Sequence, residues 1–293
     1  MRYAVYAPIL NDYSDPKRLV DLAKIAEKAG FNGFFIWDHL AIEPDGSVAL
    51  TDPTVVLAAI AGATRNLTIG AMVTPLARRR PWKVAKEMVA LDQLSNGRIV
   101  FGAGIGEPAE VEFGSFGEDS SGPARARKLD EGLAILDPLV RGERVSHEGD
   151  IYRLRSIRLS PRSVQRPRIP IWIAAALPST RGLRRAARWD GCFPVKVPAP
   201  LAQGTVANAA WCEWWLSPAE LKEAIAFLAR ERGGLSDFSI VATGSTRGDD
   251  PAAARAKVAA FAAVGANWWL EWIDDAAGSY PNATALIEKG PPC

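Results

Sequence analysis

Residues that build metal centres and disulfide frameworks are scarce in this sequence. It contains three cysteines and two histidines among 293 residues. An odd number of widely spaced cysteines (Cys192, Cys212 and Cys293) is typical of reduced thiols in the cytosol rather than of a disulfide framework. His39 and His147 have no further ligand residues nearby at metal-binding spacing, so we expect no metal site.

Long apolar runs and an excess of charge of one sign are missing as well. No apolar run approaches the ~18 residues of a membrane span, and the first 16 residues show no signal-peptide pattern. With 35 basic and 33 acidic residues, the net charge of +2 is too balanced for a nucleic-acid or membrane-surface binder. We therefore expect a soluble, cytoplasmic protein that acts on a small molecule, without a nucleic-acid or membrane partner.

Short apolar runs alternate with helical patterns along the chain. Leu67–Val73 is an apolar run of strand length, Pro81–Leu94 carries apolar residues at helical spacing, and Arg98–Ala103 has strand character again. A strand–helix–strand unit of this size implies parallel strands joined by a right-handed crossover. Eight such pairs predict a (βα)8 barrel (TIM barrel) that forms one domain over residues 1–293.

The predicted strands are Arg2–Pro8, Gly33–Asp38, Leu67–Val73, Arg98–Ala103, Ile169–Ala175, Gly191–Val197, Phe238–Thr243 and Asn267–Ile273. The predicted helices are Pro16–Ala29, Asp52–Thr64, Pro81–Leu94, Ala124–Arg141, Thr180–Arg188, Pro218–Arg232, Asp250–Ala263 and Ser279–Lys289. A short β-hairpin is predicted over Arg144–Leu159, between the fourth helix and the fifth strand.

A glycine-rich turn is absent where the competing fold would need one. A doubly wound open sheet has Gly-x-Gly-x-x-Gly after its first strand, whereas this chain has APILNDYSDP there. The barrel is therefore favoured, and its active site should lie at the carboxyl ends of the strands.

Two residues at strand ends are candidate catalytic groups. His39 follows the second strand and can accept or donate a proton near neutral pH. The alternative for His39 is a loop histidine hydrogen-bonded to Asp38. Glu107 follows two glycines that let the backbone approach a planar ligand closely, and its alternative is an acid on the surface.

Aromatic and charged residues at other strand ends predict the substrate pocket. Trp37 and Lys196 lie at the ends of the second and sixth strands. In the eighth strand, Trp269 and Glu271 share a face, and a charged residue there should point inward near the mouth or form a structural salt bridge. The loop at 198–217 holds three tryptophans, which either cover an apolar substrate or pack the barrel rim: Trp211, Trp214 and Trp215.

Two groups of residues are candidates for binding an anion. Arg78–Arg80 precede the third helix, where cations oppose the helix dipole. They have either a compensating phosphate or carboxylate or, as we favour, solvent around them. Barrels of this kind often hold phosphate after the seventh and eighth strands, which nominates Gly244, Ser245 and Arg247.

The segment LDQLSNGRIVFGAGIGE, from Leu91 to Glu107, resembles the signature of the luciferase-like monooxygenase superfamily. Members of that superfamily use a flavin or a deazaflavin. The resemblance extends over essentially the whole chain and is most specific in three stretches: Gly33–His39, Leu67–Glu107 and Pro170–Val195.

The resemblance implies a set of site residues. The pair Asp38–His39 matches one that deazaflavin members carry, with the histidine near the cofactor ring. Gly106–Glu107 matches the family form Gly-x-Gly-Glu and makes Glu107 a second proton-handling group. The region Ala71–Met72 would form a bulge with a non-proline cis peptide that presses on the ring. The loop after the fifth strand would hold the cofactor phosphate through Leu177, Ser179 and Thr180.

The resemblance leaves three functions open. The favoured one is a monooxygenase that uses oxygen and reduced FMN, supplied by a separate flavin reductase, on a small apolar organic substrate. The second is a deazaflavin (coenzyme F420)-dependent reductase or dehydrogenase, in which hydride is transferred and His39 and Glu107 handle protons. The third is a flavin-binding protein without turnover. Members of the family are commonly homodimers, so we expect one here.

Overall fold

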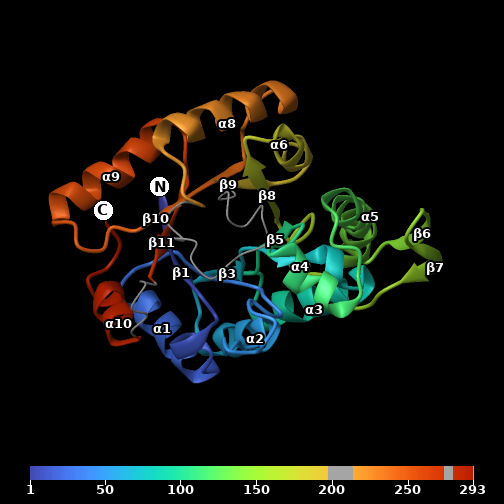
Figure 1. The fold of residues 1–293 in the computed structure, drawn as a ribbon, viewed down its shortest axis with the longest axis horizontal. Helices are drawn as coiled ribbons and strands as arrows, with labels where there is room; N and C mark the ends of the chain where they lie inside the picture. Colours follow the sequence, from blue (N-terminus) through green and yellow to red (C-terminus); the bar gives the residue numbers. More distant parts are fainter. Residues whose placement is uncertain (197–213, 274–279, 293) are drawn as a thin grey trace.

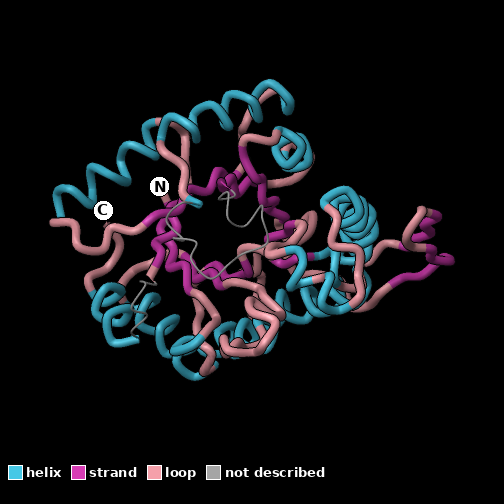
Figure 2. The backbone as a smooth tube through the Cα atoms, viewed as in Figure 1, coloured by secondary structure: helices cyan, strands magenta, loops and turns pink. Residues whose placement is uncertain are grey.

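Nine parallel strands form a nearly closed barrel at the centre of the structure (Figures 1 and 2). The computed structural model describes residues 1–196, 214–273 and 280–292. The strands of the barrel are β1 (Arg2–Ala7), β2 (Gly33–Ile36), β3 (Thr68–Ala71), β4 (Thr74–Pro75), β5 (Phe101–Gly104), β8 (Ile171–Leu177), β9 (Gly191–Lys196), β10 (Ser239–Gly244) and β11 (Trp268–Trp272).

The order of the strands confirms the predicted barrel. Around the sheet they run β3-β2-β1-β11-β10-β9-β8-β5-β4, and every pair is parallel. Ile69 and Ile99 form an isolated parallel bridge between the two ends of this sheet. The predicted strand Leu67–Val73 corresponds to β3, which ends at Ala71, and the short β4 follows just beyond its predicted end. The eight predicted barrel strands are therefore all present.

Helices surround the barrel, as Figure 2 shows. They are α1 (Pro16–Lys28), α2 (Pro53–Ala63), α3 (Pro81–Leu94), α4 (Ala109–Glu112), α5 (Gly122–Arg141), α6 (Thr180–Ala186), α8 (Pro218–Arg232), α9 (Pro251–Ala263) and α10 (Tyr280–Glu288). None of the helices in the described ranges has both the length and the apolar character needed to cross a bilayer.

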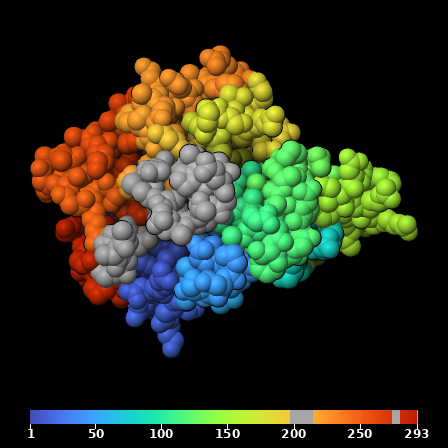
Figure 3. Space-filling model, in the orientation of Figure 1, coloured from blue at the N-terminus to red at the C-terminus, as the bar shows by residue number. Residues whose placement is uncertain are grey.

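The predicted hairpin is present as β6 (Arg144–Glu148) and β7 (Arg153–Arg158), an antiparallel pair outside the barrel. It follows α5 and projects away from the body of the molecule (Figures 1 and 3). Most of its side chains are exposed. The hairpin is therefore an addition to the barrel that leaves the strand order around the pocket unchanged.

Four helices begin with the same local signal, an N-cap followed directly by proline. The N-caps are Asp15 for α1, Asp52 for α2, Ser217 for α8 and Asp250 for α9. Each side chain accepts a hydrogen bond from a backbone N–H in the first turn, which contributes about 1 kcal/mol. Proline at the first helical position loses no hydrogen bond and has the required φ. This signal places the helix starts, and with them the loops that surround the pocket.

Three aromatic rings fill the amino-terminal half of the barrel interior. Phe35 lies 5.6 Å from Trp172 and 5.8 Å from Trp268, and the two indoles lie 5.3 Å apart, measured between ring centroids. All three side chains are buried. They form a floor, and the space above them at the carboxyl ends of the strands is available for a site.

Candidate functional site

A pocket with a volume of about 380 Å³ opens at the carboxyl ends of the strands. Small-molecule sites usually have volumes of about 300–1,000 Å³. Backbone at Gly104 and Gly106 forms part of the wall. Much of the remainder is aromatic: Tyr6, Trp37, Phe193, Trp214, Trp215 and Trp272. The pocket lies where the barrel fold predicts an active site.

Several side chains nominated from the sequence meet in this pocket. They follow β2, β3, β5 and β8, which are distant in the chain and adjacent around the barrel mouth. The residues are Trp37, Asp38, His39, Met72, Gly106, Glu107 and Ser179. Their roles in binding and catalysis stay predictions.

His39 is held by a carboxylate that the sequence did not nominate. Its Nδ1 lies 3.2 Å from Oε1 of Glu112, and its ring centroid lies 5.6 Å from that of Trp37. The hydrogen bond to Asp38 considered from the sequence is replaced by this one. The imidazole of His39 is therefore hydrogen-bonded through Nδ1 and also lines the pocket.

Glu112 is a residue of the candidate site that sequence reasoning missed. It lies in α4, a four-residue helix too short to give a helical pattern in the sequence. Its buried carboxylate accepts hydrogen bonds from the Leu40 N–H at 2.9 Å and from the Arg78 guanidinium. Nothing in the sequence around Glu112 indicates a contact with a loop 73 residues earlier.

Two arginines of the run, Arg78 and Arg79, form ion pairs with buried carboxylates, so the expectation of a solvated run is wrong for these two. Arg78 binds both Asp38 and Glu112, and its side chain is 9% exposed. Nη1 of Arg79 lies 3.3 Å from Oδ2 of Asp38. Burial raises the pKa of the Asp38 carboxyl, and the charges of the two arginines oppose that rise. Arg80 is exposed, as expected.

Glu107 lines the pocket and is also tied into the wall. Its Oε1 lies 3.1 Å from Nη2 of Arg125, and its Oε2 accepts a hydrogen bond from the Ala109 N–H at 3.0 Å. Arg125 also donates to the carbonyl of Gly106. The carboxylate is therefore a fixed group at the pocket edge rather than a free acid on the surface.

Gly106 is a position where a side chain would disturb this edge. Its φ is +87°, and a Cβ there would lie 2.9 Å from both Phe113 Cε2 and Pro75 Cβ. We expect Gly106→Ala to lower the free energy of unfolding by about 2–4 kcal/mol, from left-handed backbone and overpacking together. Gly117→Ala is the matched control, since Gly117 has φ +73° and no atom within 4 Å of a Cβ. If urea denaturation gives equal losses of unfolding free energy for Gly106→Ala and Gly117→Ala, the proposed clash is contradicted.

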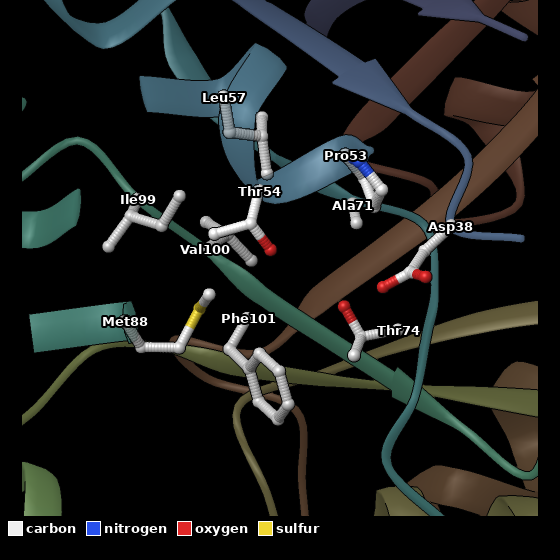
Figure 4. Close-up of a pocket in the computed structure, with 10 residues that line it drawn as sticks. All are labelled: Asp38, Pro53, Thr54, Leu57, Ala71, Thr74, Met88, Ile99, Val100 and Phe101. Atoms are coloured by element: carbon white, nitrogen blue, oxygen red, sulfur yellow. The ribbon is translucent and has the colours of Figure 1, made fainter. Parts of the chain in front are cut away.

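The strand bulge lies one residue later than the resemblance implied. The non-proline cis peptide joins Met72 and Val73, rather than Ala71 and Met72, and both of its residues line the pocket. Ala71 lies behind the barrel wall, in a small apolar pocket under α2 that it shares with Leu57 (Figure 4). Ala71 is therefore corrected from a cofactor contact to a residue of the packing layer.

The loop after β8 contributes less to the pocket than expected. Ser179 lines it and accepts a hydrogen bond from the Arg181 N–H at 3.4 Å at the start of α6. Leu177 does not line it, because strand alternation directs Ala174 and Ala176 inward and Leu177 outward. Thr180, the first residue of α6, does not line it either. The alternative phosphate residues, at the end of β10 and in the loop that follows it, are also outside this pocket: Gly244, Ser245 and Arg247.

The face of β11 that carries Trp269 and Glu271 was expected to point into the barrel, but it points toward the surrounding helices. The Trp269 ring lies 5.3 Å from that of Phe261 in α9. Glu271 accepts hydrogen bonds from Trp269 Nε1 at 2.8 Å and from the Thr246 N–H at 2.6 Å. Neither residue lines the pocket, whereas Trp272 on the opposite face does. The inward prediction for Trp269 and Glu271 is wrong, because two hydrogen bonds satisfy the buried carboxyl in the helix layer.

The buried Glu271 predicts a pH effect on stability. Burial raises the pKa of Glu271 above its usual value of 4.5. The native state then binds more protons than the unfolded state above pH 4.5, so the free energy of unfolding falls as the pH rises there. We expect Glu271→Gln to lose less stability than the wild type between pH 4.5 and 7 in urea titrations. The exposed Glu288→Gln is the control; a wild-type pH slope in Glu271→Gln would contradict the assignment.

Lys196 also lies outside the pocket. Its Nζ is 2.8 Å from Oε1 of Glu220, the acid in the first turn of α8, so an ion pair turns it away from the barrel mouth. Trp214 and Trp215 do line the pocket. Trp211 lies outside the described residues.

A family model for the luciferase-like monooxygenases matches residues 1–286 of the chain. The F420-dependent glucose-6-phosphate dehydrogenase of Microbacterium testaceum is 34% identical over 175 residues, which are 57% of this chain and 49% of that protein. The F420-dependent hydroxymycolic acid dehydrogenase of Mycobacterium tuberculosis is 32% identical over 169 residues, with 57% and 46% covered. The chain thus spans about half the length of the curated relatives it matches.

Solved structures share the fold over almost the whole chain. An F420-dependent secondary alcohol dehydrogenase in complex with an F420–acetone adduct superposes with a TM-score of 0.79 at 17% identity, covering 99% of this chain and 98% of that chain. Monooxygenase RslO1 from Streptomyces bottropensis gives a TM-score of 0.76 at 18% identity, with 98% and 96% covered.

Proposed function

Because this chain belongs to the luciferase-like monooxygenase family, we propose that it is an oxidoreductase that uses coenzyme F420 to interconvert a small neutral alcohol and its carbonyl compound. The observation that carries the proposal is a histidine in the pocket wall, His39, anchored by a carboxylate through one ring nitrogen. The F420-dependent relatives at 34% and 32% identity support the same cofactor. The proposal therefore prefers the deazaflavin alternative to the FMN monooxygenase favoured from the sequence.

The pocket residues fit a flat ring. A Cβ on Gly104 would lie 2.5 Å from Val73 Cγ2, so the backbone itself forms that wall. Met72, Val73 and Gly106 would contact the ring, and Ser179 with the exposed Arg181 would face the phosphate end. When bound, the deazaflavin accepts or supplies a hydride.

The residues of the chain supply the remaining functions. His39 would take the hydroxyl proton as the alcohol is oxidised, or return it in the reverse direction. Glu107, fixed by Arg125, would present a carboxylate at the ring edge. The aromatic wall, which includes Trp37 and Trp272, would exclude water from the reacting atoms.

The charges of the pocket favour a substrate without phosphate. Among the described lining residues the side-chain cations of Lys and Arg type are Arg181 and Arg185, and Arg185 Nε lies 2.8 Å from Oδ1 of Asp130. The sequence at 197–213 and 274–279 contains no lysine or arginine. A sugar phosphate would lack a cation beside the aromatic wall, so we propose that the substrate differs from the glucose 6-phosphate named for the Microbacterium testaceum relative.

Parallel titrations with coenzyme F420 and FMN, followed by fluorescence, test the proposal. We expect F420 to bind and to be reduced when a panel of neutral secondary alcohols is added. Binding of neither cofactor would overturn the proposal. Oxygen consumption with reduced FMN would instead establish a monooxygenase, which needs a separate reductase, and F420 binding without turnover of any donor would leave a binding protein.

A further inference from the structure

The two histidines of the chain face carboxylates through different ring nitrogens. His39 places Nδ1 3.2 Å from Oε1 of Glu112, and His147 places Nε2 3.2 Å from Oε2 of Glu131. An ionised carboxylate only accepts hydrogen bonds, so the nitrogen that faces it carries the hydrogen. The neutral forms of the two imidazoles should therefore be opposite tautomers.

The position of Glu112 is set from several directions. Its side chain is 0% exposed, and its Oε2 is paired with Arg78, which also binds the buried Asp38. Its Oε1 accepts a hydrogen bond from the Leu40 N–H at 2.9 Å in addition to the contact with His39. The ion pair with Arg78 keeps the carboxylate an acceptor, and the backbone contact fixes the oxygen that His39 meets.

We propose that Glu112 is a positioning residue that holds His39 in the Nδ1–H tautomer and leaves Nε2 as the proton acceptor for a ligand in the pocket. His39 lines the pocket, and no residue of the described ranges hydrogen-bonds to its Nε2. This inference rests on the proposed function for its catalytic meaning, whereas the tautomer itself exists without cofactor or substrate. Glu112 is separate from Glu107, which faces the same pocket from its own ion pair with Arg125.

The tautomer matters because only an unprotonated nitrogen can accept the substrate proton. In alcohol oxidation the O–H proton passes to Nε2 of His39 and the C=O double bond forms. The C–H bond would break and its hydrogen would leave with both electrons to the hydride acceptor that oxidised F420 would supply when bound, so that the alcohol is oxidised and the acceptor reduced by two electrons. Glu112 then stabilises the imidazolium through Nδ1–H, as a carboxylate does behind a catalytic histidine in serine hydrolases.

Long-range 1H–15N correlation spectra of the full chain, labelled with 15N-histidine, test the proposal directly. With two imidazoles, His39→Gln and His147→Gln assign both spin systems. Spectra recorded at rising pH, until the imidazole 15N shifts no longer change, report the neutral rings, in which wild-type His39 should carry hydrogen on Nδ1 and His147 on Nε2. A neutral His39 ring with its hydrogen on Nε2 would overturn the proposal whether or not the protein binds any cofactor.

Glu112→Gln and Glu131→Gln form a matched pair of variants. A glutamine amide both donates and accepts, so it no longer imposes one tautomer. In Glu112→Gln the ratio of Nδ1–H to Nε2–H at His39 should fall at least about tenfold, with kcat lowered by a similar factor and KM nearly unchanged. Glu131→Gln should alter His147 alone. An unchanged His39 tautomer in folded Glu112→Gln would overturn the role of Glu112. If circular dichroism shows that the variant is unfolded, the tautomer of His39 in the wild-type spectrum tests the proposal instead.

Discussion

Replacing His39 with alanine is expected to lower kcat by about 10²–10⁴, while the Kd of coenzyme F420 stays within about threefold of the wild-type value. The variant would lose the proposed proton acceptor but keep the backbone and glycine wall that we propose contacts the ring. The imidazole packs edge-to-face with Trp37 and contacts the carboxylate of Glu112, and it makes no backbone hydrogen bond within the described ranges. The effect should therefore fall on kcat. Stopped-flow reduction of F420 by a neutral alcohol measures it.

His147→Ala is the control for this experiment. His147 lies in the hairpin and contacts Glu131 rather than the pocket. Its replacement should leave kcat unchanged. Wild-type turnover by His39→Ala would remove His39 from the mechanism, and loss of F420 binding would assign it to the cofactor site instead.

Arg78→Met is expected to lower the free energy of unfolding by about 3–5 kcal/mol, because it leaves buried carboxylates without their shared cation. The side chains of Asp38 and Glu112 are 2% and 0% exposed. Arg79 still faces Asp38 at 3.3 Å, but no other arginine or lysine in the described ranges pairs with Glu112. Urea denaturation monitored by tryptophan fluorescence gives the value.

The adjacent Arg80→Met provides a matched comparison. Arg80 is exposed, and its guanidinium lies 6.0 Å from the centroid of Trp82. Its replacement should change the free energy of unfolding by less than about 1 kcal/mol. Similar small losses in both variants would show that the buried ion pairs do not contribute to stability.

The barrel could be predicted because its periodicity is local. Apolar runs of strand length, helical spacing and N-cap–proline pairs such as Asp52–Pro53 all lie within a few residues of one another. The same patterns placed the hairpin after the fourth predicted helix. The ends of the strands were predicted less accurately. β5 begins at Phe101 rather than at Arg98. The side chain of Arg98 instead donates hydrogen bonds to the carbonyls of Ala61 and Leu67.

Side-chain direction was the part of the site that local patterns did not determine. Alternation assigns Trp269 and Glu271 to one face of a strand and Trp272 to the other, but it does not tell which face points inward. The inward choice assumed that a charged residue avoids the helix layer. Hydrogen bonds from Trp269 Nε1 and the Thr246 N–H satisfy the carboxyl there, so the assumption was wrong.

The contacts around His39 were also beyond the sequence, because they join distant residues. Glu112 lies 73 residues after His39 and 34 residues after Arg78. No spacing rule links these positions, and α4 is too short to be recognised. The resemblance brought His39 and Glu107 to the pocket correctly, since it concerns the loops at strand ends rather than the residues packed behind them.

The aromatic floor of Phe35, Trp172 and Trp268 has a kinetic consequence. These buried rings block passage through the amino-terminal end of the barrel, so the proposed cofactor and substrate would share the entrance at the carboxyl ends. If one ligand lies beneath the other in this pocket, the deeper one would have to enter first and leave last. Three side chains outside the pocket lining would then impose an order of binding.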